Sequence, residues 1–242
     1  YRSDSLKHTF YLSWLFGIGY FATSIYWIPR AFYMDFGSWV LALGLGVPAL
    51  LALSSYMALF VAVPAMVSWR FRCYKNFYPF IFAVLWCAGE WLRSYGLLGF
   101  PWNLAGYIWA GNDVVSLSLL QMAVYGKIWL VNFCVLFSVA LFFRFGWKSG
   151  VSFLVMLGLV GALRFWAEEP FYENVDVALI QPNVPQREKW DLSKREGYVQ
   201  ELVDMSFSSK VQQADLIVWP ETSLPFVIGE NDLFLHGLSS YL

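Results

Sequence analysis

The chain has 242 residues, of which 59% are hydrophobic, 20% aromatic and only 14% charged. Soluble domains carry about 45–50% apolar and about 25% charged residues, so this composition excludes an ordinary water-soluble domain. The formal net charge of −1 conceals two regions of opposite charge: residues 1–166 hold 11 Lys and Arg against 4 Asp and Glu, and residues 167–242 hold 5 against 13. Two environments therefore meet near Trp166.

Five segments of the first region are predicted to cross a bilayer as helices, because a hydrocarbon core of about 30 Å takes roughly 20 mostly apolar helical residues. Pro29 is expected to end the first segment, and Pro48 and Pro64 to kink or bound the second. Residues 1–166 are thus predicted to form a polytopic α-helical membrane bundle. The segments are residues 10–28, a stretch within residues 39–67, and residues 78–92, 125–143 and 151–166.

The orientation of the bundle follows from Lys and Arg, which collect in short cytoplasmic loops. One set of span ends carries seven of these residues, whereas the opposite ends carry Arg30, Arg93, Lys127 and Arg164. Because five crossings are an odd number, the acidic region after Trp166 is predicted to be extracytoplasmic. The seven basic residues are Arg2, Lys7, Arg70, Arg72, Lys75, Arg144 and Lys148.

Residues 167–242 have the pattern of the start of a soluble α/β domain. Residues 175–181 and 215–219 are short, β-branched, apolar runs, each followed by a proline, which predicts two buried strands. Between them, Ser193 and Glu196 have the spacing of a capping box, and an apolar helix face continues to about Ser209. This order predicts a parallel strand pair with a crossover helix.

Glu221 is the most informative candidate for catalysis. It directly follows the second predicted strand in the run Trp219-Pro220-Glu221, and open α/β sheets bind ligands at the carboxyl ends of their strands. Walled by Trp219 and prolines, a carboxylate here can lose water and work as a general base near neutral pH. The alternative is a solvated loop acid or a partner for a loop N–H, and the residues alone leave both open.

Three stretches of the chain together resemble the bacterial apolipoprotein N-acyltransferases, membrane-bound members of the nitrilase superfamily. Trp-Pro-Glu alone is shared by the wider superfamily, whereas its combination with the membrane motif is specific. The resemblance covers nearly the whole chain and implies a nitrilase-like α-β-β-α domain beside a larger bundle. Both the bundle and the domain are therefore expected to be incomplete, truncated at both ends. The stretches are Gly-Glu-Trp-Leu-Arg-Ser-Tyr-Gly-Leu-Leu-Gly-Phe-Pro-Trp at residues 89–102, Ile-Gln-Pro-Asn-Val-Pro-Gln-Arg-Glu-Lys-Trp at residues 180–190, and Trp-Pro-Glu at residues 219–221.

The activity implied by the resemblance is N-acylation of lipoproteins through a Glu, Lys and Cys triad. In this family a Cys takes an acyl group from a phospholipid as a thioester and passes it to the free α-amino group of a diacylglyceryl-cysteine. The resemblance makes Glu221 the general base and Trp190 a substrate-facing tryptophan, for which core packing is the alternative. Neither a Cys nor a Lys follows Glu221, so the chain as given is expected to be inactive.

The membrane motif supplies four further candidates. Glu90 and Arg93 are three residues apart, so they can share a helix face and pair there. The pair can be functional, or a structural pair that fastens two helices. Phe100 and Trp102 lie in a turn that can guide lipid chains toward Glu221 as substrate-binding residues, with an ordinary interfacial aromatic belt as the alternative.

Other ligands have less support in the sequence. Cys73, Cys87 and Cys134 all lie in the apolar region and are predicted to be small buried hydrophobes. His8 and His236 are too isolated to suggest a metal site, and no cofactor is expected. The acidic charge of residues 167–242 argues against nucleic-acid binding.

The expected partners are a phospholipid acyl donor, a diacylglyceryl-lipoprotein acceptor and the lipid bilayer, and the protein is expected to be a monomer. The expected location is the bacterial inner membrane, with the catalytic region on the periplasmic side. Three alternatives remain. A membrane transporter would explain the spans and Glu90 but not the Trp-Pro-Glu run. An amide hydrolase of the nitrilase type would explain Glu221 but would not need the spans. A non-catalytic relative of the family would explain both the spans and the Trp-Pro-Glu run.

Overall fold

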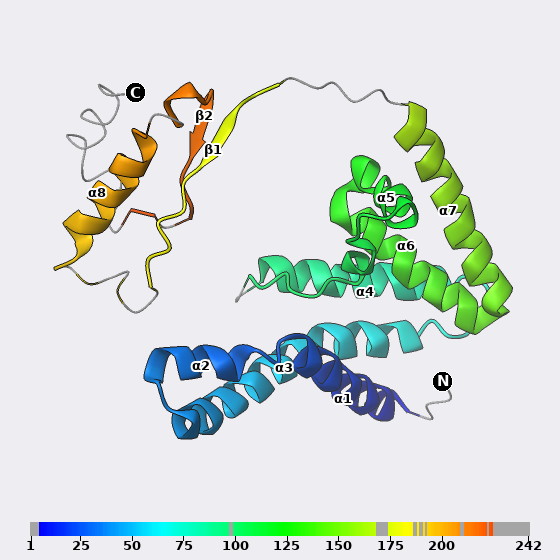
Figure 1. The fold of residues 1–242 in the computed structure, drawn as a ribbon. Coiled ribbons are helices and arrows are strands. Elements are labelled where there is room, and N and C mark those ends of the chain that lie inside the picture. The colour runs from blue at the N-terminus through cyan, green and yellow to red at the C-terminus, as the bar shows by residue number, and fades with distance from the viewer. Residues whose placement is uncertain are drawn as a thin grey trace. The chain divides into compact units, whose positions relative to one another are not determined.

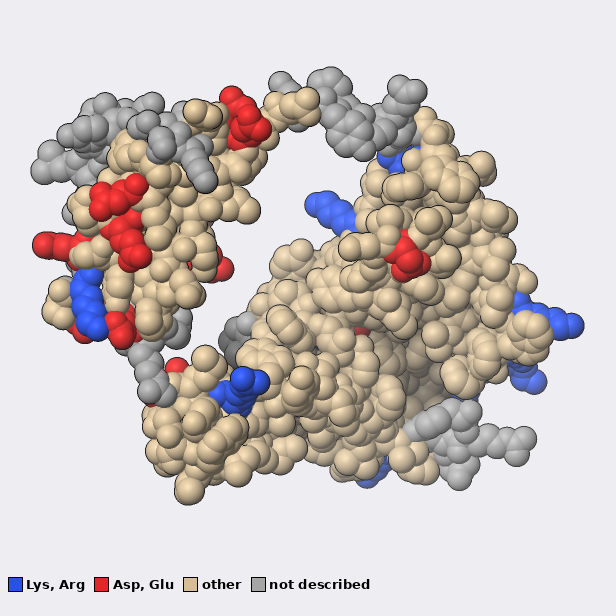
Figure 2. Space-filling view, in the orientation of Figure 1, with Lys and Arg blue, Asp and Glu red and all other residues tan. Residues whose placement is uncertain are grey.

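A computed structural model of the chain describes residues 5–96, 99–167, 174–185, 188, 191, 193–208, 211–221 and 223–224. The chain divides into two units, Tyr1–Glu169 and Pro170–Leu242, which are described separately (Figure 1). Figure 2 shows acidic side chains gathered on the second unit and few charged side chains on the visible face of the first.

Every secondary-structure element in the described part of the first unit is a helix, and the helices are joined by turns and loops. Many of its large apolar side chains face outward; Val40, Phe143 and Leu163, for example, are 81%, 82% and 71% exposed. Such exposure is expected where lipid replaces water around a helix bundle. The elements are α1 (Leu6–Ser24), α2 (Ile28–Phe36), α3 (Trp39–Trp69), α4 (Tyr78–Tyr95), the 3₁₀ helix η1 (Ala105–Trp109), α5 (Val114–Leu120), α6 (Ala123–Phe145) and α7 (Trp147–Ala167).

Three of these helices, α3, α6 and α7, are long and apolar enough to cross a membrane. They correspond to three of the five predicted spans. Of the other two, α1 begins with the polar residues Lys7 and His8, and α4 carries Glu90 and Arg93 within its last two turns. These residues lower the apolar content of both helices.

Helix α4 nevertheless runs through the unit beside its apolar neighbours. Arg144 at the end of α6 donates a hydrogen bond from Nε to the carbonyl of Lys75, 2.9 Å away in the α3–α4 connection. The ends of α3 and α6 and the start of α4 therefore lie at one end of the unit. With 18 residues, α4 is about 27 Å long, close to the thickness of a hydrocarbon core.

Two helix boundaries differ from the predictions at prolines. The first helix ends at Ser24 instead of Ile28, and Pro29 lies in the first turn of α2, where its fixed φ and missing N–H suit a helix start. Helix α3 continues through Pro48 and Pro64, as a helix in a bilayer can when neighbouring helices accommodate the freed backbone groups.

Helix α4 packs closely against α3 at the gap that Pro64 leaves in the backbone hydrogen bonding of α3. Pro64 has no N–H to donate to the carbonyl of Phe60, four residues earlier. Gly89 of α4 packs against this carbonyl: a Cβ at Gly89 would lie 2.3 Å from Phe60 O and 2.7 Å from Pro64 Cγ. Only a residue without a side chain permits this crossing, as is common between membrane helices.

The described part of the second unit contains β1 (Val177–Leu179), α8 (Arg195–Ser206), η2 (Val211–Gln213) and β2 (Leu216–Val218). The strands pair in parallel with Val177 opposite Leu216, which confirms the predicted parallel pair with a helix between the strands. The predicted burial of the strands is wrong: Leu179 is 76% exposed and Leu216 is 51% exposed. In both strands the outer two residues are exposed and the middle one is half-buried; Ile180, directly after β1, is buried.

The start of α8 also differs from the sequence prediction. Lys194 is the N-cap residue, and no described side chain caps the helix. The predicted capping box between Ser193 and Glu196 therefore does not form, and the Ser193 hydroxyl donates instead to Asp191 Oδ1 at 2.7 Å. The apolar face is confirmed by the complete burial of Leu202, although the helix ends at Ser206.

Candidate functional site

Glu221 lies in a turn directly after β2, at the carboxyl end of the parallel strand pair. Ser206 of α8 accepts a hydrogen bond at 2.9 Å from the indole N–H of Trp219, which ties the end of β2 to α8. The indole is thereby directed to α8, and the Glu221 side chain is exposed. Of the two alternatives that the sequence left open, this exposure fits the solvated loop acid and not enclosure by Trp219 and Pro220. Glu221 is accessible to a reacting group.

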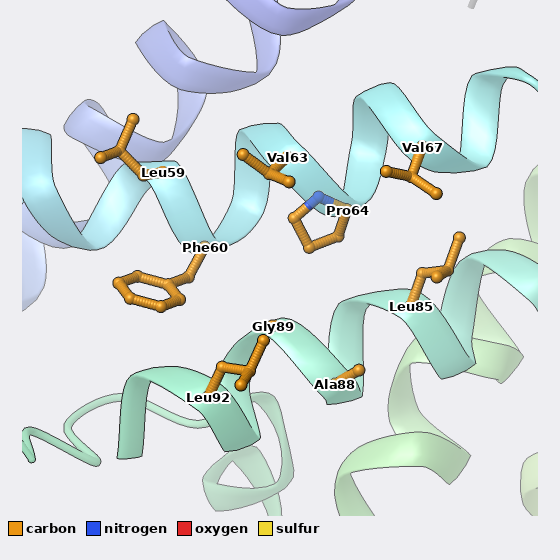
Figure 3. Close-up of a pocket in the computed structure, with 9 residues that line it drawn as sticks. All are labelled: Leu59, Phe60, Val63, Pro64, Val67, Leu85, Ala88, Gly89 and Leu92. Carbon is orange, nitrogen blue, oxygen red and sulfur yellow. The ribbon is translucent and has the colours of Figure 1, made fainter. Parts of the chain in front are cut away.

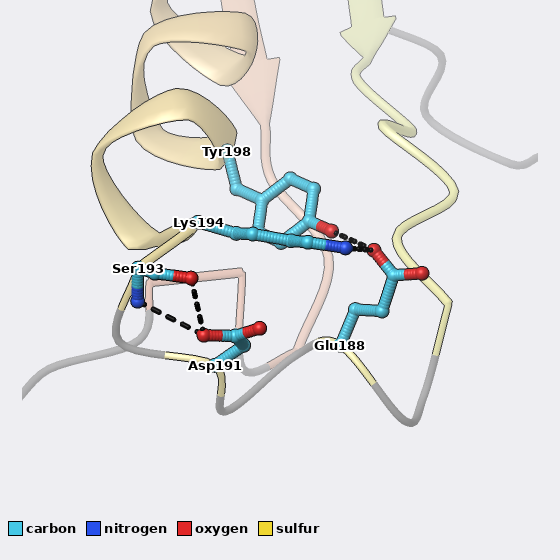
Figure 4. A network of polar contacts seen from close by, with 5 residues as sticks. All are labelled: Glu188, Asp191, Ser193, Lys194 and Tyr198. Carbon is cyan, nitrogen blue, oxygen red and sulfur yellow. Dashed lines mark hydrogen bonds and ion pairs between the residues drawn. The ribbon is translucent and has the colours of Figure 1, made fainter.

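Trp190, predicted to face substrate, lies outside the described residues. The residues around it that are described form a polar network at the start of α8 (Figure 4). Glu188 accepts hydrogen bonds from Lys194 Nζ at 2.5 Å and from the Tyr198 hydroxyl at 2.7 Å. Asp191 accepts from both the backbone N–H and the hydroxyl of Ser193, at 2.9 and 2.7 Å.

This network, which we call the exposed network, shifts the ionisation of its own members. The hydrogen bond from Lys194, with a second from Tyr198, holds the pKa of Glu188 below its ordinary value. The hydrogen bonds from Ser193 lower the pKa of Asp191 in the same way. Because its members are open to solvent, the network is screened by water and salt, and it orders its segment only weakly.

A second polar group, which we call the buried cluster, lies inside the first unit. It consists of Trp86, Glu90 and Arg93 of α4 and Asn132 of α6. The Glu90 carboxylate accepts hydrogen bonds from Trp86 Nε1 at 3.1 Å and from Asn132 Nδ2. Glu90 and Asn132 are 1% and 0% exposed, so water competes with neither contact.

Arg93 does not form the predicted ion pair with Glu90. Its Nη1 donates instead to the carbonyls of Phe100 and Trp102, at 2.8 and 2.6 Å. The guanidinium carbon lies 5.0 Å from the ring centroid of Phe21 in α1, within the range of a cation–π contact. Arg93 is 1% exposed, so its charge is held between backbone carbonyls and an aromatic face.

Phe100 and Trp102, the predicted lipid-contacting residues, lie together beside the buried cluster. Their rings are stacked, with centroids 5.9 Å apart, and Trp27 meets Trp102 edge-on at 5.8 Å. Phe100 packs against the apolar core that includes Phe21, whereas Trp102 is 46% exposed. The structure thus brings together four of the sequence-predicted site residues: Glu90, Arg93, Phe100 and Trp102.

An apolar pocket of about 300 Å³ lies between α3 and α4. Figure 3 shows Phe60 and Pro64 on the side of α3 that faces α4, with Leu85 and Leu92 of α4 extending toward α3. All of the side chains that line it are apolar, so it can hold hydrocarbon but offers no chemistry. The lining residues are Leu59, Phe60, Val63, Pro64, Val67, Leu85, Ala88, Gly89 and Leu92.

The three cysteines are all free and differ in burial. Cys134 is buried and Cys87 half-buried, but Cys73 is exposed in the turn after α3, which corrects its prediction as a buried residue. Among the described residues, no group of three or more His, Cys, Asp or Glu is placed to hold a metal ion.

Sequence reasoning missed Asn132 and the Glu188–Lys194 contact. Asn132 carried a usable signal, since it is a polar residue inside an otherwise apolar predicted span and polar groups at that depth need a partner. The Glu188–Lys194 contact carried none, because charged pairs six residues apart are common in loops.

Comparison with protein families places residues 1–141 in the apolipoprotein N-acyltransferase N-terminal domain. Among curated proteins, the apolipoprotein N-acyltransferase of Rickettsia bellii is 31% identical over 237 residues, covering 92% of this chain and 45% of its own. Those of Allorhizobium ampelinum and Pseudomonas syringae pv. tomato are 32% and 33% identical; they cover 99% of this chain, and 46% and 48% of their own. The chain spans about half the length of these relatives.

Proposed function

The chain belongs to the apolipoprotein N-acyltransferase family, and we propose from this premise that it forms part of a membrane acyltransferase. The proposed reaction moves an acyl group from a phospholipid to the α-amino group of a diacylglyceryl-cysteine at a lipoprotein N-terminus. The observation that carries the proposal is the extent of similarity: two relatives match 99% of the chain, so both units are included. In this proposal the second unit begins a nitrilase-like domain.

Glu221 is the general base in the proposed reaction. Its exposed carboxylate, at the carboxyl end of β2, can accept a proton from a group that approaches the strand ends. The thiol and the lysine of the triad would come from another part of the protein, because residues 222–242 contain neither a Cys nor a Lys.

Glu221 moves one proton in each half of the reaction. It accepts the thiol proton as sulfur attacks the ester carbonyl of the phospholipid, and it returns that proton to the departing lysophospholipid oxygen. In the second half, the amine nitrogen attacks the thioester and gives a proton to Glu221. The released sulfur takes up this proton, which restores the thiol.

We place the second unit on the periplasmic side of the bacterial inner membrane. Three helices long and apolar enough to cross a membrane support the membrane location, and the basic residues at one end of the first unit, Lys75 and Arg144 among them, support the orientation. Alkaline phosphatase fused after Leu242 should be active and a fluorescent protein that matures only in the cytoplasm should stay dark. The opposite pair of results would reverse the orientation.

The catalytic proposal is tested with Glu221→Gln in the protein at the length of its relatives. The amide keeps size and hydrogen bonding but cannot accept a proton, so transfer of labelled acyl chains should fall by about 10²–10⁴-fold. Glu201→Gln, at an exposed position on α8 of the same unit, is the matched control and should leave the rate unchanged. Near-normal transfer by a folded Glu221→Gln protein would exclude this role, and no transfer by the unmodified protein would indicate a non-catalytic relative.

A further inference from the structure

The segment that carries Phe100 and Trp102 is held by its backbone. We call residues 99–104, between α4 and η1, the aromatic loop. Arg93 donates from one nitrogen to the carbonyls of both Phe100 and Trp102, so a single side chain fixes the two peptide groups beside the stacked rings. Tyr20 of α1 donates to the carbonyl of Asn103 at 3.3 Å.

Asn132 fastens η1, the short helix that follows the aromatic loop. Its Oδ1 accepts a hydrogen bond at 2.8 Å from the backbone N–H of Gly106 in η1, and its Nδ2 donates to Glu90. A carboxylate can only accept, so Glu90 fixes which end of the Asn132 amide faces the Gly106 N–H. Gly106 allows this approach, since a Cβ there would lie 3.0 Å from the Asn132 backbone nitrogen.

We propose that Arg93 and Asn132 are positioning residues, which hold the aromatic loop so that Phe100 and Trp102 receive the acyl chains of the phospholipid donor. The inference rests on the function proposed above. Both residues are too deeply buried, at 1% and 0% exposure, to touch a lipid, so they act through the loop backbone. Trp102, at 46% exposure, is the part of this assembly that a lipid can reach.

The role of a preformed loop is to reduce the cost of binding. Ordering a mobile loop when lipid arrives would consume part of the binding free energy, and a loop already fixed by buried hydrogen bonds avoids this loss. Loss of the buried cluster should therefore raise KM for the phospholipid and change kcat little, because the reacting groups lie elsewhere.

The test uses the protein at the length of its relatives, in phospholipid nanodiscs. Asn132→Leu removes all three hydrogen bonds of the amide: the one from Gly106, the one to Glu90 and a longer one, 3.6 Å, to Cys87 Sγ. The double variant Glu90→Gln with Asn132→Asp exchanges donor and acceptor: the new amide on α4 can donate to the new carboxylate on α6, which still accepts from Gly106. Ser138→Ala is the matched control, since Ser138 is also a buried polar residue of α6 but donates within its own helix, to Val135.

Hydrogen–deuterium exchange at residues 99–110 is the readout that does not depend on activity. Asn132→Leu should speed exchange there by about three- to tenfold, the equivalent of one buried hydrogen bond. Exchange in α3 and α7 should stay unchanged, as should exchange everywhere in Ser138→Ala. The double variant should restore slow exchange. In acyl transfer, Asn132→Leu should raise KM for phosphatidylethanolamine about threefold or more and leave kcat within about twofold.

Three results would overturn the proposal: exchange at residues 99–110 that Asn132→Leu leaves unchanged, faster exchange in every helix, or a fall in kcat at unchanged KM. The exchange data are obtained whether or not the protein transfers acyl groups. Absence of transfer by the unmodified protein would therefore count against the proposed function, while the exchange pattern would still decide whether Asn132 holds the loop.

Discussion

The two polar groups of this chain use similar side chains in opposite surroundings. In the buried cluster, Glu90 accepts from an indole and an amide inside a helix bundle, at 1% exposure. In the exposed network, Glu188 accepts from an ammonium and a phenol, and the side chains of its salt bridge with Lys194 are 39% and 47% exposed. When a hydrogen bond breaks, water can take the place of the lost partner in the exposed network but not in the buried cluster.

The comparison teaches that the surroundings, more than the number of hydrogen bonds, decide what a polar contact contributes. Leaving a buried donor or acceptor without a partner costs about 1–3 kcal/mol, and more for a charged group. Exposed charged contacts lose most of their strength to solvent and to the entropy of long side chains. Inside membranes the measured free energy of a hydrogen bond between helices is smaller than this cost, averaging about 0.6 kcal/mol and reaching about 1.7.

The largest effect is expected from Arg93→Met, which leaves two loop carbonyls without donors. The free energy of unfolding of the helical unit, measured by SDS titration in mixed micelles, should fall by roughly 3 kcal/mol. Arg144→Met is the matched comparison, because Arg144 also donates to a backbone carbonyl but lies at an exposed end of α6. It should cost well under about 1 kcal/mol. Equal costs for the two variants would show that burial does not set the value of the contact.

A glycine in each unit extends the comparison to packing. Gly89→Ala would place a Cβ 2.3 Å from Phe60 O, so α3 and α4 must move apart, at a cost of about 1–3 kcal/mol. At Gly197 in α8, no described atom lies within 4 Å of such a Cβ. Gly197→Ala should therefore stabilise α8, by up to about 1 kcal/mol from helix propensity. Thermal unfolding of both variants checks this, and a stable Gly89→Ala protein would contradict the close crossing.

The smallest effect is expected from the exposed network, and it depends on pH. Because the pKa of Glu188 lies below its ordinary value, the contact with Lys194 stabilises the folded state above the unfolded value of about 4.3 and is lost as pH falls through the lower folded-state pKa. Cleavage within residues 185–195 by an acid protease should increase only when the pH falls below the folded-state pKa of Glu188. Lys194→Met should move the increase toward pH of about 4.3, with Glu201→Gln as control. A transition that Lys194→Met does not move would contradict the cause assigned to the shift.

Most of the helical architecture could be predicted from the sequence, because long apolar runs have few alternatives. Helices α3, α6 and α7 and the parallel pairing of β1 with β2 follow from such local patterns. The break between α1 and α2 does not, since Pro29 is compatible with both the end of one helix and the start of the next. The exposure of β1 depends on how many strands the sheet has, which its own residues do not encode.

The candidate site was only partly predictable for the same reason. The motif singled out Glu90 and Arg93 but not their partners, because the three-residue spacing suggested a mutual pair. The actual partners of Glu90 are Trp86, one turn earlier in α4, and Asn132, distant in sequence. Those of Arg93 are two carbonyls of the loop beyond the helix end. Glu221 was placed correctly after β2, whereas the hydrogen bond that directs the Trp219 indole to Ser206 of α8 could not be predicted from the motif.

Double-mutant cycles in the two polar groups test most directly the claim that the buried cluster, and not the exposed network, holds its surroundings in place. One cycle pairs Glu90→Leu with Asn132→Leu, and the other pairs Glu188→Leu with Lys194→Leu, each followed by unfolding of its own unit. We expect a coupling free energy of roughly 1 kcal/mol or more between Glu90 and Asn132, and a clearly smaller coupling between the solvent-exposed Glu188 and Lys194. Coupling in the exposed pair as strong as in the buried pair, or its absence from the buried pair, would contradict the account.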